Sequence, residues 1–145
     1  MCGRSVGKRN PERGADVLSV ASVISVLDDD PYVRAALNNL LESRGYIVHT
    51  FASADEFLRS ANSSDTSCVI ADVQMPSVTG IDLLTQMRAQ GSATPFIFIT
   101  AFPDESVRVR ALKAGAICFL GKPFVAAELI QCLERALTAG DETVA

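Results

Sequence analysis

The chain has 145 residues, of which 48% are hydrophobic and 21% charged, and its formal net charge is -4. This length suits one domain that buries roughly 70% of the surface of its unfolded chain, and the hydrophobic share excludes a disordered protein. The acidic balance argues against direct binding to nucleic acid, and the lack of a long uninterrupted apolar stretch argues against a membrane span.

Residues 1–21 differ from the rest of the chain because they contain several glycines and basic residues but no apolar periodicity. We expect them to form a disordered leader; the less favoured alternative is a basic arm for an anionic partner. Residues 22–139 are expected to form the folded domain, followed by a short acidic tail at 140–145.

Short apolar runs alternate with segments whose apolar residues have helical spacing. Strands are predicted over residues 23–27, 46–51, 68–71, 96–99 and 117–120. A helix is predicted after each strand: Ser53 and Glu56 form a capping box at the second, the third spans residues 80–89, and the fourth runs from a cap at Asp104 to Gly115. This alternation indicates an α/β domain of three layers, in which helices cover both faces of a parallel sheet.

The four cysteines, Cys2, Cys68, Cys118 and Cys132, form no CxxC pair. The last three lie in apolar segments and are interpreted as buried small hydrophobic residues, with no disulfide needed to hold the domain. This usage fits a reducing cytoplasm, which is the expected location.

Polar residues follow four of the predicted strands. Asp28 and Asp29 come after the first strand, Asp72 after the third, Thr100 after the fourth and Lys122 after the fifth. Ligands of open parallel sheets bind at the carboxyl ends of the strands. Carboxylates beside a hydroxyl and a lysine are typical of a site for a divalent cation and a phosphoryl group.

The aspartates after the first strand do not all need the same explanation. Asp30 precedes Pro31, which is a common way to begin a helix, so Asp30 is interpreted as a cap. Asp28 and Asp29 are not needed as caps, and at ~4 Å and an effective dielectric of about 20 their repulsion costs on the order of 4 kcal/mol. A bound cation would remove this cost.

The motifs in and around these positions are Asp28-Asp29, Asp72-Val73-Gln74-Met75-Pro76 with Thr79-Gly80, Ile99-Thr100-Ala101, and Leu120-Gly121-Lys122-Pro123-Phe124. With them, the chain resembles the receiver domain of bacterial two-component response regulators. The motif style is nearest to that of the nitrogen-fixation regulators. The resemblance implies a flavodoxin-like, doubly wound sheet of five strands in the order 2-1-3-4-5, as in chemotaxis receivers. It also implies a cis bond before Pro123.

The same resemblance implies a role for each residue of the acidic group. Asp72 would be the phosphoacceptor, which takes its phosphoryl group from the phosphohistidine of a sensor histidine kinase or a phosphotransfer protein. Mg²⁺ would be bound directly by Asp29 and Asp72, through water by Asp28, and by the backbone carbonyl of Gln74. The protein would catalyse only its own phosphorylation and dephosphorylation.

A switch is implied as well. Lys122 and Thr100 would contact the phosphoryl oxygens, and a shift of Thr100 would let Phe119 turn inward. The output face would then change for a downstream protein or a second copy of the chain, with no direct role for nucleic acid or membrane. The charged residues expected on this face are Arg108, Arg110, Lys113 and Glu128.

Two alternatives remain open. Asp28-Asp29-Asp30 superficially fits the DxD pattern of haloacid-dehalogenase-like phosphohydrolases, with Asp28 as the nucleophile, although the helix at Pro31 leaves no room for a cap domain. A module on the same fold that is never phosphorylated is the other alternative.

The only histidine, His49, is interpreted as a surface residue of the second strand. The sequence identifies neither the kinase nor the pathway, and it fits a stand-alone receiver as well as a piece of a larger regulator.

Overall fold

The computed structural model describes residues 21–60, 63–75 and 78–144, with side chains described as far as residue 138. Its elements are β1 (Val23–Leu27), α1 (Pro31–Ser43), β2 (Ile47–Phe51), α2 (Ala54–Arg59), the short 3-10 helix η2 (Ser63–Asp65), β3 (Cys68–Asp72), α3 (Gly80–Ala89), β4 (Phe96–Thr100), α4 (Glu105–Ala114), β5 (Cys118–Gly121) and α5 (Ala126–Val144). The expected leader lies outside the described residues, apart from Ala21. The backbone of α5 continues through residues 140–144, where an acidic tail was expected.

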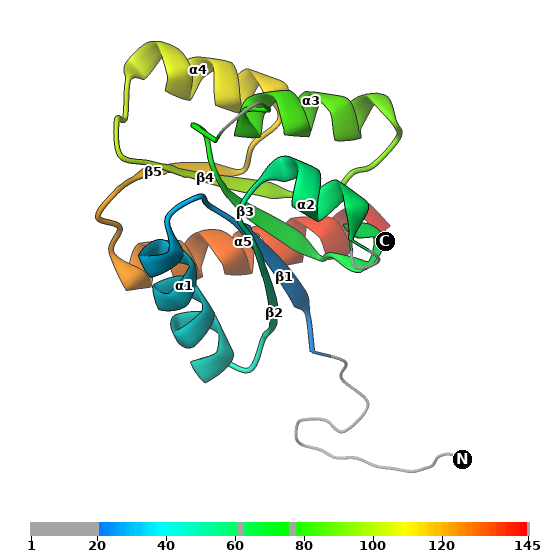
Figure 1. Ribbon diagram of the computed structural model, residues 1–145. Coiled ribbons are helices and arrows are strands. Elements are labelled where there is room, and N and C mark those ends of the chain that lie inside the picture. Colours follow the sequence, from blue (N-terminus) through cyan, green and yellow to red (C-terminus); the bar gives the residue numbers. More distant parts are fainter. Residues whose placement is uncertain (1–20, 61–62, 76–77, 145) are drawn as a thin grey trace.

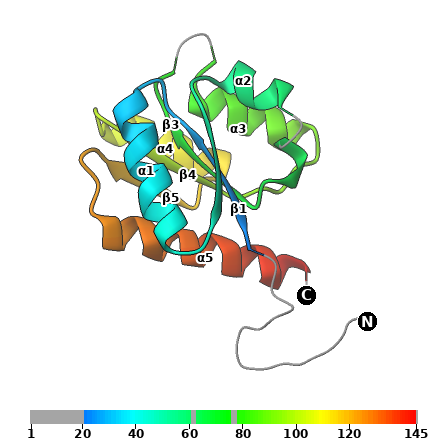
Figure 2. The same cartoon turned by 60° about the horizontal axis from the view of Figure 1, so that its bottom comes forward.

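The five strands form one parallel sheet in the order β2-β1-β3-β4-β5, which confirms the expected order. Helices α2, α3 and α4 cover one face of this sheet, and α1 and α5 cover the other (Figures 1 and 2). The strands β1 and β3 are neighbours although β2 separates them in the chain. The sequence after β1 therefore lies beside the end of β3.

Strand β4 shows why these sequences form buried strands. Phe96 and Phe98 belong to the core cluster under α2, α3 and α4, whereas Ile97 and Ile99 belong to the cluster under α1 and α5. Successive side chains of a strand point to opposite faces, so a strand covered on both sides is apolar at every position. All four side chains are completely buried. The sheet thus has a hydrophobic core on each face.

The helix starts follow the expected capping chemistry. Asp30 accepts a hydrogen bond from the first turn of α1, and Asp104 does the same for α4. At α2, Ser53 accepts from the amide of Glu56, which confirms this half of the capping box, whereas the carboxylate of Glu56 accepts from the amide of Ala52 and not from that of Ser53. Capping helps to fix where each helix begins, and α1 begins directly after Asp28 and Asp29.

Cys68, Cys118 and Cys132 are buried in the hydrophobic core, as interpreted, but two of them form a bond that was not expected. Cys118 in β5 and Cys132 in α5 form a disulfide, with Cα atoms 6.2 Å apart, whereas Cys68 is a free, buried thiol. The two bonded cysteines are 14 residues apart in the chain, so they become neighbours only because α5 packs back on the sheet beside β5. Cys2 lies outside the described residues.

Within the described part of the chain, no helix combines the length and the apolar character needed to cross a membrane.

Candidate functional site

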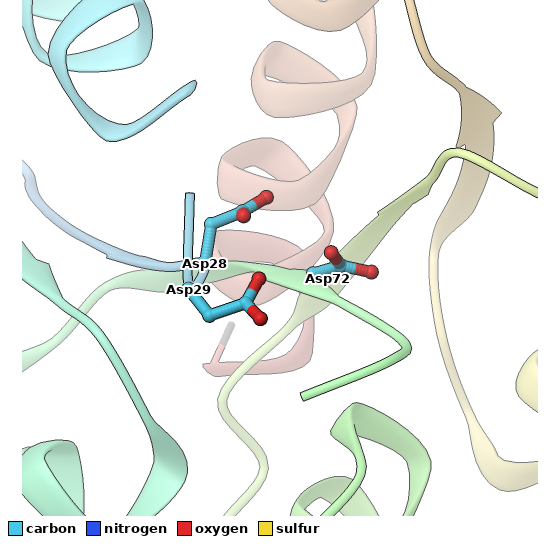
Figure 3. A group of neighbouring side chains, drawn as sticks. All are labelled: Asp28, Asp29 and Asp72. Carbon is cyan, nitrogen blue, oxygen red and sulfur yellow. The ribbon is translucent and has the colours of Figure 1, made fainter. Parts of the chain in front are cut away.

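Three carboxylates meet at the carboxyl edge of the sheet (Figure 3). Asp28 and Asp29 follow β1 and Asp72 ends β3, and one oxygen from each lies within 4.8 Å of the others. The register pairs Leu27 with Ala71, which brings the two strand ends level with each other. Asp28 and Asp72 are buried, whereas Asp29 is exposed. Among the described residues this is the only group of three potential metal ligands of this kind.

Lys122 connects two of these carboxylates. Its Nζ atom lies 2.7 Å from Oδ2 of Asp28 and 2.9 Å from Oδ2 of Asp72. Burial alone would lower the pKa of Lys122, but hydrogen bonds and attraction from Asp28 and Asp72 together raise it. The ammonium group therefore stays charged and supplies a fixed cation at the end of β5.

Asp28 is the most constrained member of the group. Its Oδ1 accepts a hydrogen bond from the amide of Asp30 at 2.9 Å, and Nη1 of Arg34 donates to its backbone carbonyl at 2.7 Å. Its buried Oδ2 contacts Lys122 but has no well-oriented hydrogen bond among the described residues. Burial raises the pKa of Asp28 more than Lys122 and the amide of Asp30 lower it. A further cation would stabilise this buried charge.

Both oxygens of Asp72 have partners. Oδ1 accepts from the amide of Gln74 and Oδ2 accepts from Lys122, each at 2.9 Å. Asp72 is only 6% exposed, so its carboxylate is held in one orientation. A carboxylate that is fixed in place beside a cation can act as a nucleophile toward a phosphoryl group.

Thr100 ends β4, the strand next to β3. The register pairs Asp72 with Ile99 and Thr100 with Gly121, so Thr100 lies one residue beyond Asp72 at the same edge. Its side chain is almost completely buried, and its hydroxyl accepts a hydrogen bond from the amide of Phe102 at 3.2 Å. On β5, Phe119 is half-buried against the core cluster under α2, α3 and α4.

The sequence interpretation gave no role to two residues that shape the site. A Cβ atom on Gly80 would lie 2.6 Å from the carbonyl oxygen of Asp72 and 2.7 Å from the ring of Phe98, so only glycine fits beside Asp72. The glycine at the first position of α3, where a residue with a side chain is expected, could have indicated this close approach to Asp72. Arg34 had no such signal, because its contact with Asp28 depends on how α1 turns away from β1.

Two further expectations concern His49 and the bond before Pro123. His49 is a half-buried residue in the middle of β2, paired in register with Ser25. The Lys122-Pro123 bond is cis. The structure thus brings together Asp28, Asp29, Asp72 and Lys122, with Thr100 on the adjoining strand.

Comparisons with known proteins agree with this geometry. The family model described as the response regulator receiver domain matches residues 24–134. The response regulator protein TodT of Pseudomonas putida is 44% identical over 117 residues, which cover 81% of this chain and 52% of TodT. The chain spans about half the length of the curated relatives it matches.

Solved structures show the same similarity. The response regulator StyR matches with a TM-score of 0.78 and 40% identity, over 86% of this chain and 63% of StyR. The structure titled FixJ-N matches with a TM-score of 0.74 and 32% identity, over 83% of this chain and 96% of FixJ-N. The family match, the strand order and these structures show that this chain belongs to the response regulator receiver domain family.

Proposed function

We propose that this receiver domain is the phosphoacceptor of a two-component phosphorelay, and that Asp72 takes a phosphoryl group from a sensor histidine kinase or a phosphotransfer protein in the cytoplasm. The observation that carries the proposal is the convergence of Asp28, Asp29 and Asp72 at one edge of the sheet, with Lys122 between two of them. The immediate start of α1 at Pro31 also leaves no insertion after β1, where the rival phosphohydrolase would need one.

Mg²⁺ is the proposed cofactor. Asp29 and Asp72 would hold it directly, Asp28 through water, and Gln74 through its backbone carbonyl. The donors are all oxygens, as Mg²⁺ prefers, and the buried Oδ2 of Asp28 without a well-oriented hydrogen bond fits a nearby cation. When bound, the ion neutralises negative charge on the phosphoryl oxygens.

In the proposed transfer, a carboxylate oxygen of Asp72 attacks the phosphorus atom of the partner's phosphohistidine. A phosphorus–oxygen bond forms while the phosphorus–nitrogen bond breaks, and the imidazole leaves with the electron pair. Lys122 is already 2.9 Å from Asp72 and needs only a small shift to contact a phosphoryl oxygen. The Thr100 hydroxyl lies on the adjoining strand and is proposed to bind another.

The proposed output is a change in the face formed by α4, β5 and α5. Thr100 would move toward the phosphoryl group, and Phe119 would turn into the space that it leaves. A downstream protein or a second copy of the chain would bind the altered face. Arg108 on this face is already paired with Glu105 at 2.8 Å, whereas Arg110 and Lys113 are exposed charges.

The assignment of Asp72 is tested by labelling with acetyl phosphate in the presence of Mg²⁺. We expect Asp72→Asn to abolish labelling, because the amide cannot form the acyl phosphate. Asp65→Asn is a matched control, since Asp65 is an exposed carboxylate in η2, just before β3, and should leave labelling unchanged. Full stoichiometric labelling of Asp72→Asn would refute the assignment.

A further inference from the structure

The disulfide of Cys118 and Cys132 lies on the proposed output face. Both cysteines line a surface hollow of about 370 Å³ between α4, β5 and α5, together with Phe119 and Arg135. The cysteines are 8% and 6% exposed, so they are shielded but border an opening to solvent. Arg135 follows Cys132 by three residues on α5 and provides a positive charge on the same side of the helix. The hollow brings solvent to the residues on which the disulfide lies.

Cys68 offers the opposite environment in the same molecule. It begins β3 in the middle of the sheet and is completely buried, and this burial raises its pKa to about 12. A thiol reacts through its thiolate, so Cys68 is inert at neutral pH while the protein is folded. Of the cysteines in the described residues, only Cys118 and Cys132 combine a partner with a route to solvent.

We expect the fold to form without this bond. Hydrophobic clusters on both faces of the sheet hold the domain, and the disulfide joins only the edge strand β5 to the helix beside it. The proposed function places the chain in the cytoplasm, where thiols are kept reduced and disulfides are usually transient or redox-sensing. A bond that lies on the output face and is expected to be dispensable for folding is suited to regulation.

We propose that Cys118 and Cys132 are a reversible thiol–disulfide site that exchanges with low-molecular-weight disulfides of the glutathione class and controls the mobility of the output face. The thiolate of one cysteine attacks a glutathione disulfide, whose S–S bond breaks and releases one glutathione thiolate. The thiolate of the second cysteine then attacks the mixed disulfide and releases the other. Two protein thiols are oxidised and one glutathione disulfide is reduced to two thiols; the two protons lost by the protein thiols are taken up, through solvent, by the two glutathione thiolates.

The regulatory effect follows from the neighbour of Cys118, and this part rests on the proposed function. Phe119 is the next residue of β5, and the disulfide ties its strand to α5. Phe119 packs on the opposite face of the sheet from α5, so the coupling would pass through the backbone of β5, which Cys118 joins to α5. The oxidised form should resist the inward turn proposed for Phe119, and reduction should release it.

Thiol counting tests the chemistry without any need for phosphorylation. A Cys2→Ser variant, which leaves three cysteines, is equilibrated with reduced or oxidised glutathione, quenched in acid, unfolded, alkylated and mapped by mass spectrometry. We expect Cys118 and Cys132 to be alkylated only after the reducing buffer, with Cys68 alkylated after both. Equal alkylation of Cys118 in both buffers, or a disulfide that excess reduced glutathione cannot open in the folded protein, would overturn the proposal.

A second measurement tests the control of the output face. Beryllofluoride with Mg²⁺ is titrated into the reduced and oxidised forms, and the NMR signals of Phe119 are followed. We expect the reduced form to bind beryllofluoride about fivefold more tightly or better, a typical size for coupling between two sites. In Cys118→Ala/Cys132→Ala, glutathione should have no effect, because neither thiol remains to form a mixed disulfide. Equal affinities of the two forms would overturn the regulatory role. Loss of the Phe119 response in both forms, with reversible oxidation intact, would count against the proposed function instead.

Discussion

The ammonium group of Lys122 lies 2.7 Å from Asp28 Oδ2 and 2.9 Å from Asp72 Oδ2. Replacing it by glutamine would leave two buried carboxylates close together without this cation. We expect Lys122→Gln to lower the free energy of unfolding by about 2 kcal/mol in Mg²⁺-free buffer, because a buried charge that loses its partner is strongly destabilising. Urea denaturation measures the change.

Added Mg²⁺ should then stabilise Lys122→Gln more than the unaltered protein, because the ion would replace the lost charge. The matched control is Lys113→Gln, since Lys113 is exposed on α4 and has no part in the acidic group. If both variants lost the same stability, or if Mg²⁺ helped both equally, Lys122 would not be balancing the charge of the site.

At the scale of elements, the start of α3 is packed directly against the acceptor strand. A Cβ atom on Gly80 would come within 2.6 Å of the carbonyl oxygen of Asp72. We therefore expect Gly80→Ala to displace the end of β3, to cost about 1–3 kcal/mol as other overpacked cores do, and to slow labelling of Asp72 by acetyl phosphate. Urea denaturation and the labelling rate are the measurements.

Gly91 provides the contrast. Its φ of +89° is unfavourable for alanine, but a Cβ atom there would meet nothing within 4 Å. Gly91→Ala should therefore cost stability through its backbone while leaving the labelling rate unchanged. Labelling that slowed equally in both variants would attribute the Gly80 effect to general destabilisation.

The surface of α1 beside the site is a second element-scale feature. An apolar hollow next to Lys122 is formed by the first turns of α1 and the segment after β5, and its lining includes Tyr32, Val33, Ala36, Pro123 and Phe124. Tyr32 is 83% exposed. A kinase that presents phosphohistidine to Asp72 has to cover this neighbouring surface.

We expect Tyr32→Ala to weaken phosphotransfer from the partner kinase, as loss of an exposed aromatic anchor does at interfaces. Labelling by acetyl phosphate, which needs no docking, should stay the same. The control is Ile47→Ala, since Ile47 is an exposed apolar residue on β2 and is not part of this hollow. Reduced labelling by both donors would mean that Tyr32 affects the site itself.

The sequence predicted the elements well because the apolar periodicity of each strand and helix is local information. Three strand ends were placed one residue short, at residues 71, 99 and 120, because Asp72, Thr100 and Gly121 extend the ladders through pairing with neighbouring strands. The same limit explains why the disulfide was not predicted: its two cysteines meet through the packing of α5 on β5, which no local sequence pattern reveals. The strand order came from the family resemblance and not from periodicity.

At the scale of the whole molecule, β4 and β5 lie between the proposed acceptor and the proposed output face. Thr100 pairs in register with Gly121, and Phe119 pairs with Phe98, so both residues proposed for the switch lie on adjacent strands. In this structure the Thr100 hydroxyl accepts from the amide of Phe102, a contact that movement toward a phosphoryl group would break. The switch therefore requires the phosphoryl group to offer a stronger partner than that amide.

Removing the hydroxyl of Thr100 should leave phosphorylation of Asp72 possible but prevent the change at Phe119 that follows from it. We expect Thr100→Ala to be labelled by acetyl phosphate but to lose most of the beryllofluoride-induced change at Phe119, measured by NMR. A nearly complete shift between two states needs about 5.5 kcal/mol of differential binding. A hydrogen bond to a charged group typically contributes about 1.5–3 kcal/mol. Losing the contact between Thr100 and the phosphoryl group would therefore leave the active state much less populated. Thr100→Ser keeps the hydroxyl and should keep the response. A full response in Thr100→Ala would show that the output face is coupled to Asp72 by another route.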